Sequence, residues 1–264
     1  MKDLAMIRRP LSVLSTLALA AALPWWLHAP SVSSQGQGSP PAEPASLVCA
    51  DDGFDTGALD AGWSTTRLGD ATLGDASPVD VAGEGRLRVS GDGSELYHGD
   101  DNGVFTHRTI TGDFRVEVEV SDIAQDLGGQ YRKACLMVRG TDGTGGGVGP
   151  RDPRLMACYV PHFPTPDVPA LQFDVRFADG AAATELASTV LDVDNVAVEA
   201  PVRFAFTRIG NRVTPSFSVD GGVTWVEPLG AASSVTPGVD IELGDAVQAG
   251  VMVSSYEPGT AFAA

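Results

Sequence analysis

Three carboxylates, Glu117, Glu119 and Asp122, stand close together in a stretch whose apolar and polar residues alternate. Side chains alternate between the two faces of a strand, so Glu117 and Glu119 lie on the same face. Two carboxylates on one face are the groups that acid–base hydrolysis of a glycosidic bond requires. The same pattern also describes an ordinary solvated strand face with the intervening valines packed inward, and we prefer that interpretation.

The histidines offer no comparable arrangement. His98, His107 and His162 are too far apart for metal-ligand spacing, and no serine in a nucleophile turn accompanies them. His28 falls in an apolar leader. The sequence therefore supports neither a histidine metal centre nor a Ser-His-Asp site, and no catalytic residue is assigned.

Short clusters of aspartate and asparagine could donate oxygen ligands to calcium. The clusters are Asp51, Asp52 and Asp55; Asp100, Asp101 and Asn102; and Asp192, Asp194 and Asn195. None has the spacing of an EF-hand loop, and these residue types are also ordinary turn formers. Calcium is thus the one cofactor considered, with turn formation as the alternative for each cluster.

Aromatic side chains with polar neighbours could stack on sugar rings and hydrogen-bond their hydroxyl groups. The candidates are Tyr97 and His98, Tyr131 and Arg132, Tyr159, His162 and Phe163, and Tyr256. Trp63 and Trp225 are interpreted as core or hairpin-packing residues instead.

Cys135 and Cys158 flank a glycine-rich loop, residues 141–153. If the flanking strands pair around the centre of this loop, the two cysteines face each other. Export favours oxidation, so a cross-strand disulfide is predicted, which leaves Cys49 free. Two small buried hydrophobic side chains are the alternative.

These residues must be positioned by short strands, because period-two alternation recurs along the chain between Gly, Asp and Pro residues. Strands are predicted at 86–89, 114–120, 136–139, 155–160, 171–177, 202–206 and 249–253. No segment after the leader shows a helical period. The pattern predicts a single antiparallel two-sheet sandwich in which each sheet has one buried and one polar face.

The residues Ser218, Asp220, Gly222, Thr224 and Trp225 follow one another in an S-x-D-x-G-x-T-W pattern. Asp can bond backbone groups ahead of it, and Gly adopts positive φ without strain. We therefore predict a structural hairpin whose turn is held by Asp220 and whose outgoing strand carries Trp225.

This pattern resembles the Asp-box, a structural hairpin motif of sialidases and of many secreted β-proteins. The order of further motifs, from F-D-x-x-x-L-D-x-x-W at 54–63 through G-D-F at 112–114 and L-M-V-R at 136–139, resembles the concanavalin A-like lectin/glucanase superfamily. Within it, the chain is similar to an uncharacterised family of bacterial secreted domains. The resemblance covers about residues 51–262 and departs at Cys135, where that family has glycine.

The resemblance implies a jelly-roll sandwich and makes Arg139 the first candidate for ligand binding. A surface arginine paired with an acid is the alternative for Arg139. Glucanases of this fold use an E-x-D-x-x-E strand, and the 117–122 segment lacks its central aspartate.

The beginning of the chain is of a different kind. Arg8 and Arg9 precede an apolar run from Leu11 to Leu27, which predicts a signal peptide or membrane-targeting leader over residues 1–34. A disordered linker over 35–49 and the sandwich over 50–264 follow. An uncleaved membrane anchor is the alternative to cleavage, and the leader is then the only contact with a membrane.

The net charge of −17 would repel a phosphate backbone, so nucleic acid is excluded as a partner. The function predicted is a monomeric, non-catalytic binding module for carbohydrate or a cell-surface ligand, secreted or held in the cell envelope. A glycoside hydrolase with an unrecognised carboxylate pair and a purely structural surface domain are the alternatives.

Overall fold

A computed structural model describes residues 52–55, 57–81, 84–97, 99–123, 131–140, 152–161, 169–190, 200–228, 238–257, 259 and 262–263. The chain divides into two units, Met1–Pro44 and Ala45–Ala264, and every described residue belongs to the second. The predicted leader and all of the predicted linker therefore lie outside the described residues. Among the described residues, no helix has the length and apolar character needed to cross a membrane.

The regular elements of the described residues are all β-strands. They are β1 (Ser64–Leu68), β2 (Gly74–Val81), β3 (Glu84–Gly91), β4 (Gly103–Thr111), β5 (Phe114–Val120), β6 (Lys133–Gly140), β7 (Arg154–Val160), β8 (Ala170–Arg176), β9 (Thr184–Val190), β10 (Val202–Ile209), β11 (Arg212–Ser218), β12 (Val239–Asp240), β13 (Ala246–Ser254) and β14 (Phe262–Ala263).

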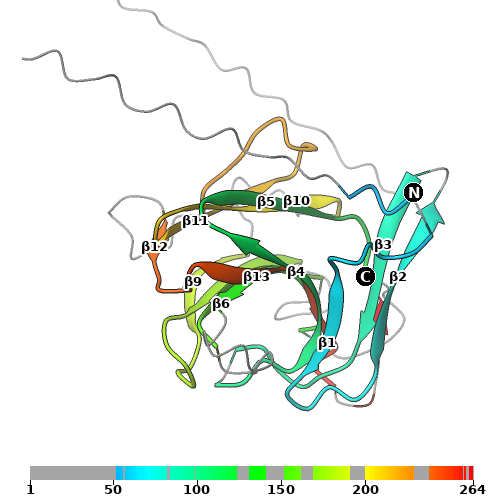
Figure 1. Ribbon diagram of the computed structural model, residues 1–264, viewed down its shortest axis with the longest axis horizontal. Helices are drawn as coiled ribbons and strands as arrows, with labels where there is room; N and C mark the ends of the chain where they lie inside the picture. The colour runs from blue at the N-terminus through cyan, green and yellow to red at the C-terminus, as the bar shows by residue number, and fades with distance from the viewer. Residues whose placement is uncertain are drawn as a thin grey trace, which may run out of the picture. The chain divides into compact units, whose positions relative to one another are not determined.

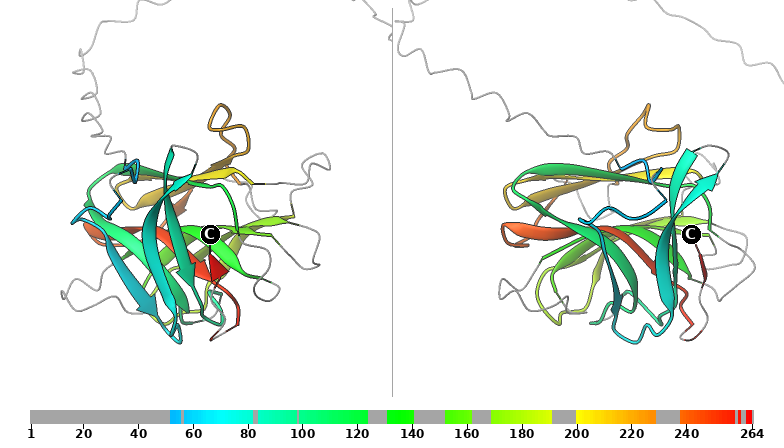
Figure 2. Two further views of the ribbon diagram at one scale, coloured as in Figure 1. Left: turned by 90° about the vertical axis from the view of Figure 1, so that its right-hand side faces the viewer. Right: turned by 45° about the vertical axis from the view of Figure 1, so that its right-hand side comes forward.

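The strands form three antiparallel sheets. A large sheet has the order β1-β4-β13-β6-β7-β8-β9, a small sheet the order β12-β11-β10-β5, and a third sheet the order β14-β3-β2. The large and small sheets make two layers (Figure 1), and the third sheet lies beside them (Figure 2). The predicted all-β, antiparallel sandwich is confirmed.

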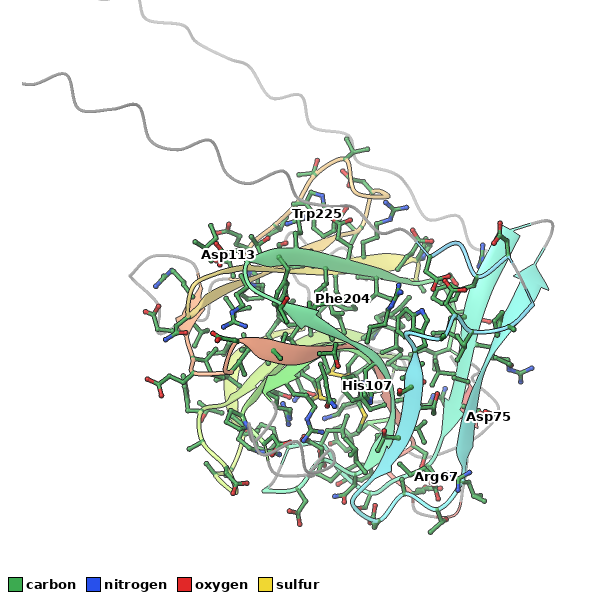
Figure 3. The ribbon with its side chains drawn as sticks, in the orientation of Figure 1. Arg67, Asp75, His107, Asp113, Phe204 and Trp225 are labelled. Atoms are coloured by element: carbon green, nitrogen blue, oxygen red, sulfur yellow. A yellow bond between two sulfur atoms is a disulfide. The ribbon has the colours of Figure 1, made fainter. Side chains whose placement is uncertain are left out.

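The space between the two layers holds the main core. In β5, Phe114, Val116 and Val118 face inward, and the strand has the bounds that its alternation predicts. Phe173 of the large sheet contacts Phe204 and Phe217 of the small sheet, with ring centroids 6.2 and 6.0 Å apart. Figure 3 shows Phe204 between the layers. Each such ring stabilises the fold by about 1.5–3 kcal/mol through burial.

At β6, β7 and β8 the large sheet is buried on both faces, so its polar face is covered there and does not meet solvent. Every residue of β6, β7 and β8 is buried. The face turned away from the small sheet, which we call the outer face, carries a second apolar cluster. Its members are Leu68, Leu96, Phe105, Cys135, Met137, Met156, Cys158, Val160 and Met252. The alternation of Phe173 with Asp174 marked a polar face correctly, but alternation does not reveal whether another segment covers that face.

The segment that covers part of the outer face is residues 92–102, described except at residue 98, and we call it the strap. It connects β3 to β4. Its Leu96 is fully buried in the second cluster, and its Glu95 forms an ion pair with Lys133 of β6, with Nζ and Oε1 3.4 Å apart. An apolar anchor and a charge therefore both fasten the strap to the large sheet.

Asp92 fixes the beginning of the strap. Its carboxylate accepts hydrogen bonds from the backbone N–H groups of Thr72, Leu73 and Gly259 and from the Thr72 hydroxyl, each 2.8 Å long. Burial alone would raise the pKa of Asp92, but these four donors more than offset it, and the pKa is lowered. One ionised carboxylate thus joins three chain segments.

The two cysteines of the glycine-rich region lie opposite each other on β6 and β7. The ladder pairs Cys135 with Cys158, and a disulfide joins them with a Cα–Cα distance of 4.0 Å. Both side chains belong to the second apolar cluster of the outer face. Cys49 lies outside the described residues.

The turn after β11 is held by side chains. Asp220 Oδ1 accepts from the backbone N–H of Thr224 (2.8 Å) and from the Ser218 hydroxyl (2.7 Å), whose oxygen accepts from Gly222 N–H (2.9 Å). The hydrogen bond from the Thr224 backbone, followed by that from Ser218, lowers the pKa of Asp220 to about 2. Gly221 and Gly222 have φ of 73° and 91°, so the turn uses two left-handed positions.

The prediction of an outgoing strand that carries Trp225 is wrong. Only an isolated bridge between Phe217 and Val226 closes the turn, and Trp225 lies outside any strand. The Trp225 ring instead lies on the solvent side of the small sheet (Figure 3), 4.5 Å from the guanidinium carbon of Arg115. A cation–π contact therefore replaces the further ladder bonds that a full hairpin would make.

Candidate functional site

Two tyrosines meet where β6 and β13 pair at one end of their ladder. The ladder ends with Ser254 opposite Lys133, and Tyr256 and Tyr131 each lie two residues beyond that end. Their ring centroids are 5.1 Å apart with an interplanar angle of 55°. We call these two residues the tyrosine pair.

Both members of the tyrosine pair have a left-handed backbone, with φ of 73° at Tyr131 and 65° at Tyr256. Phe54 is the only other non-glycine residue with positive φ in the described part of the chain. A bulky side chain in this region of φ costs about 1–3 kcal/mol, and such strain persists where the surroundings enforce it.

Hydrogen bonds on both sides of Tyr256 enforce that conformation. The Ser255 hydroxyl donates to the carbonyl of Glu257 (2.7 Å) and accepts from Glu257 N–H (3.1 Å), which encloses Tyr256 in a small ring. The Ser254 hydroxyl donates to the Gly93 carbonyl of the strap (3.1 Å). Tyr256 is nevertheless 40% exposed and Tyr131 is half-buried, so both rings are open to solvent.

A second arrangement of polar groups lies on the outer face of the large sheet. Arg139 of β6, Arg154 of β7 and Arg176 of β8 are adjacent in register, and none of them is exposed. Gln248 of β13 continues the same row beside Arg139. We call Arg139, Arg154 and Arg176 the arginine row.

The strap and the residues before β7 supply the counter-charges. Arg154 Nε and Arg176 Nη2 both donate to Asp101 Oδ1, at 2.5 and 2.8 Å, and Arg176 Nη1 donates to Asp101 Oδ2 at 3.0 Å. Arg139 Nη2 donates to Asp152 (2.9 Å) and its Nη1 lies 3.8 Å from Asp101. Arg154 also donates to the backbone carbonyl of Leu96 in the strap. Asp101 thus lies among three buried guanidinium groups.

His107 lies beside this cluster and is neutral at pH 7. Its Nε2 is 3.2 Å from the Thr66 hydroxyl, and its ring stacks on Phe105 at 4.7 Å. Burial, and then the positive charge of Arg139, lower the pKa of His107 to about 4. Because its imidazole is neutral above about pH 5, His107 is not a protonated general acid at neutral pH.

The carboxylates on β5 lie far from this face, on the solvent side of the small sheet. Glu117 is paired with Arg115 Nε at 2.6 Å and Glu119 with Arg203 Nε at 2.7 Å. Both glutamates are exposed. This arrangement is that of a solvated strand face, the interpretation preferred from the sequence.

The candidate ligand residues do not form one site. Arg139 is paired with an acid, as the alternative interpretation supposed, but it is buried and not at the surface. Tyr159 packs into the core between the layers, because its position places it on the opposite face of the sheet from Arg139. Tyr97 is half-buried, and its backbone carbonyl accepts from Ala183 N–H at 3.2 Å. His162 lies outside the described residues.

The described residues contain no group of three or more His, Cys, Asp or Glu side chains that could hold a metal ion. The Asp52 carboxylate accepts from Phe54 N–H (3.1 Å) and Trp63 Nε1 (2.5 Å), which is turn chemistry, and Asp55 is exposed. Asp101 is bound by arginines. Asn102 Oδ1 accepts from Asp70 N–H (3.0 Å). The candidates Asp51, Asp192, Asp194 and Asn195 lie outside the described residues and stay a prediction.

Sequence reasoning missed Arg154, Arg176 and Asp101 as partners. Arg176 alternates visibly with buried residues, but the register that aligns it with Arg154 and Arg139 depends on loop lengths and strand order. The aspartate was noticed only as a possible turn or calcium residue.

No protein-family model and no curated protein matches the chain. Among solved structures, it is similar to a functionally unknown protein from Saccharomyces cerevisiae, with 16% identity, 77% of this chain and 92% of that chain covered, and a TM-score of 0.51. It is also similar to a xylan beta-1,4-xylosidase from Bacillus halodurans C-125, with 15% identity, 84% of this chain and 40% of that chain covered, and a TM-score of 0.50. At these identities the likeness shows the fold alone, an antiparallel β-sandwich.

Proposed function

We propose that this protein is an extracytoplasmic, non-catalytic β-sandwich that binds carbohydrate, and that the tyrosine pair is its sugar-stacking platform. The observation that carries the proposal is the pair itself. The rings of Tyr131 and Tyr256 are in tilted contact and accessible to solvent, and both residues have a left-handed backbone conformation.

An exposed aromatic ring suits a sugar because its face packs against the C–H groups of a pyranose while its hydroxyl group reaches a sugar hydroxyl. Fixing the ring before binding reduces the entropy lost on association. Strained backbone positions concentrate where a ligand is held, since selection for packing alone would remove the strain. The hydrogen bonds of Ser255 to Glu257 supply such fixation at Tyr256.

The described carboxylates favour binding over hydrolysis. Glu117 and Glu119 each form an ion pair with an arginine on the solvent side of the small sheet, and Asp101 is bound by two arginines. These arginines engage the three carboxylates in ion pairs within the protein, and the proposal gives them no catalytic role. The xylosidase of similar fold makes a polysaccharide a reasonable ligand class, although a fold alone does not determine function.

Binding to neutral polysaccharides, such as xylan, mannan and cellulose, tests the proposal. We expect Tyr131→Ala and Tyr256→Ala each to weaken binding to the preferred polysaccharide by about tenfold or more, which is about 1.4 kcal/mol. Phe177→Ala is the matched control, because Phe177 is an aromatic residue 50% exposed at the end of β8. Unchanged affinity in a variant that carries both Tyr131→Ala and Tyr256→Ala would show that the polysaccharide does not bind at the tyrosine pair.

The same incubations distinguish the alternative of a glycoside hydrolase. A binding module leaves the polysaccharide intact, so the concentration of reducing ends should not rise during prolonged incubation with stoichiometric protein. A time-dependent increase that follows the protein concentration would favour hydrolysis and would direct the search to carboxylates outside the described residues.

A further inference from the structure

The arginine row places three like charges side by side in the interior. Neighbouring strands are about 5 Å apart, and Arg139, Arg154 and Arg176 occupy successive strands with no exposed surface. Buried guanidinium groups require anions in direct contact, because their separation from water is otherwise very costly. Such a row is therefore a place built to hold negative charge.

The anion at the centre of the row does not come from the sheet. Asp101 belongs to the strap and brings both carboxylate oxygens into hydrogen-bond contact, Oδ1 with Arg154 and Arg176 and Oδ2 with Arg176. The arginines thus hold one planar carboxylate by several N–H groups, the geometry by which guanidinium groups recognise carboxylates in general.

An arginine donor remains beside this carboxylate. Arg154 Nη1 is buried and has no hydrogen-bond partner among the described residues. On the same face, the acceptor Gln248 Oε1 and the ring nitrogen His107 Nδ1 also lack a partner within that part of the chain. Buried polar atoms are nearly always paired, so an atom of this kind points to a partner beyond Asp101.

We propose that the arginine row is a carboxylate-binding site that Asp101 occupies as an internal ligand, and that the carboxylate of an acidic sugar takes the position of Asp101 when the strap lifts. The choice of a sugar as the bearer of the carboxylate rests on the proposed function. The carboxylate site itself rests on the arginines and on the strap.

Asp101 and an external carboxylate compete for the arginine row, and the strap favours Asp101 because it tethers that residue beside the row. A tethered group has an effective concentration of millimolar or more, so an external carboxylate competes well only if its other atoms make further contacts. Lifting the strap would uncover such contacts in the second apolar cluster around Leu96. Removing the Asp101 carboxylate by mutation should therefore reveal the site to small carboxylates.

The first experiment uses thermal unfolding of Asp101→Ala in 0.15 M sodium chloride, where electrostatic repulsion by the acidic surface is screened beyond about 8 Å. We expect formate, acetate and galacturonate each to raise the Tm of Asp101→Ala with a saturable concentration dependence, and galactose to have no effect. The control is Asp113→Ala, which removes an exposed carboxylate that accepts from Gly210 N–H at 2.7 Å. Equal responses of the two variants, or no response of Asp101→Ala, would overturn the proposal.

The second experiment uses the unaltered protein and decides the matter if Asp101→Ala fails to fold. Hydrogen exchange is measured over residues 92–102 with oligogalacturonate and with a neutral xylo-oligosaccharide of equal length. We expect oligogalacturonate to accelerate exchange in the strap by several-fold and the neutral sugar to leave it unchanged. Unchanged strap exchange at the highest oligogalacturonate concentration would contradict the proposal.

The two proposals fail separately. Tyr131→Ala and Tyr256→Ala should lose binding to neutral polysaccharide and keep the accelerated strap exchange. If neutral polysaccharide binds through the tyrosine pair and carboxylates have no effect on the strap, only the carboxylate site is excluded.

Discussion

At the scale of single residues, the most informative ionisable group is His107. It is buried against Phe105, and the guanidinium group of Arg139 lies near enough to repel a proton. Its pKa in the folded protein is about 4, below the value of 6.5 for an ordinary histidine. The folded state therefore excludes a proton that the unfolded chain accepts.

This difference predicts a loss of stability on acidification. Between about pH 6.5 and pH 4 the unfolded chain binds more protons than the folded protein, so the free energy of unfolding falls as the pH falls. From pH 7 to pH 5 the loss due to His107 is about 2 kcal/mol. Urea unfolding at both pH values measures it.

The matched variant is His107→Gln, which keeps a polar side chain without an ionisable group. We expect the pH dependence of its unfolding free energy to be smaller by that amount. An equally steep dependence in His107→Gln would mean that other groups titrate in this range.

The residue scale is also where the sequence was least sufficient. In the sequence, Asp101 belongs to an Asp-Asp-Asn cluster that suits a turn or a calcium site. No neighbouring residue indicates that its partners are arginines. Its partners Arg154 and Arg176 are 53 and 75 residues away. Tyr131 and Tyr256 were recognised as available aromatic residues, but their contact depends on the pairing of β6 with β13.

At the scale of elements, the strap is the feature that distinguishes this sandwich. It is an irregular segment that covers part of the outer face of the large sheet. Without it, polar side chains of the strands on that face would meet water. The strap is fastened at its start by Asp92, in its middle by Leu96 and Glu95, and near its end by Asp101.

We predict that Asp92→Ala lowers the free energy of unfolding by about 2–4 kcal/mol. The change removes an ionised acceptor and leaves four donors from Thr72, Leu73 and Gly259 without it. Urea unfolding with hydrogen exchange over residues 92–102 measures both the loss and its location.

Asp75→Ala is a suitable control, because Asp75 is exposed and its carboxylate, among the described contacts, accepts only from the N–H of the adjacent Ala76. A similar loss in Asp75→Ala, or an Asp92→Ala protein as stable as the unaltered one, would contradict the anchoring role.

Alternation predicted elements where one face packs and the other meets solvent. The bounds of β5 followed directly from Phe114 to Val120, because its Arg and Glu residues mark the solvent face. Alternation was insufficient at Thr224 and Trp225, whose strand-forming character is outweighed by the contact of Trp225 with Arg115. It was also insufficient for β6 to β8, where polar residues face a covered surface.

At the scale of the whole molecule, the Cys135–Cys158 bond connects the two strands at the centre of the large sheet. The cysteines are 23 residues apart, and closing a loop of that length in the unfolded chain stabilises the folded state by about 3 kcal/mol in the chain-entropy model. We expect the Cys135→Ala, Cys158→Ala double variant to lose about this amount in urea unfolding.

Titration of free thiols provides an independent check of that bond. Two free thiols titrated in the unfolded, non-reduced protein at these positions would show that the cysteines are unpaired in solution, and the double variant should then lose only the contribution of two small buried side chains.

Fold class was predictable at this scale because it depends on a pattern repeated in many segments. The separate third sheet beside the two layers was not predictable, since strand order depends on which distant edges meet. The similarity to solved structures at 15 and 16% identity supports the sandwich.

The most direct test of the central claim, carbohydrate binding at the tyrosine pair, is an NMR titration of protein carrying ¹³C-labelled tyrosine rings with the neutral oligosaccharide that corresponds to the preferred polysaccharide. The account predicts saturable shifts of the Tyr131 and Tyr256 ring resonances, with the ring of Tyr159 in the core unaffected. Saturable binding with no shift at Tyr131 and Tyr256 would contradict it.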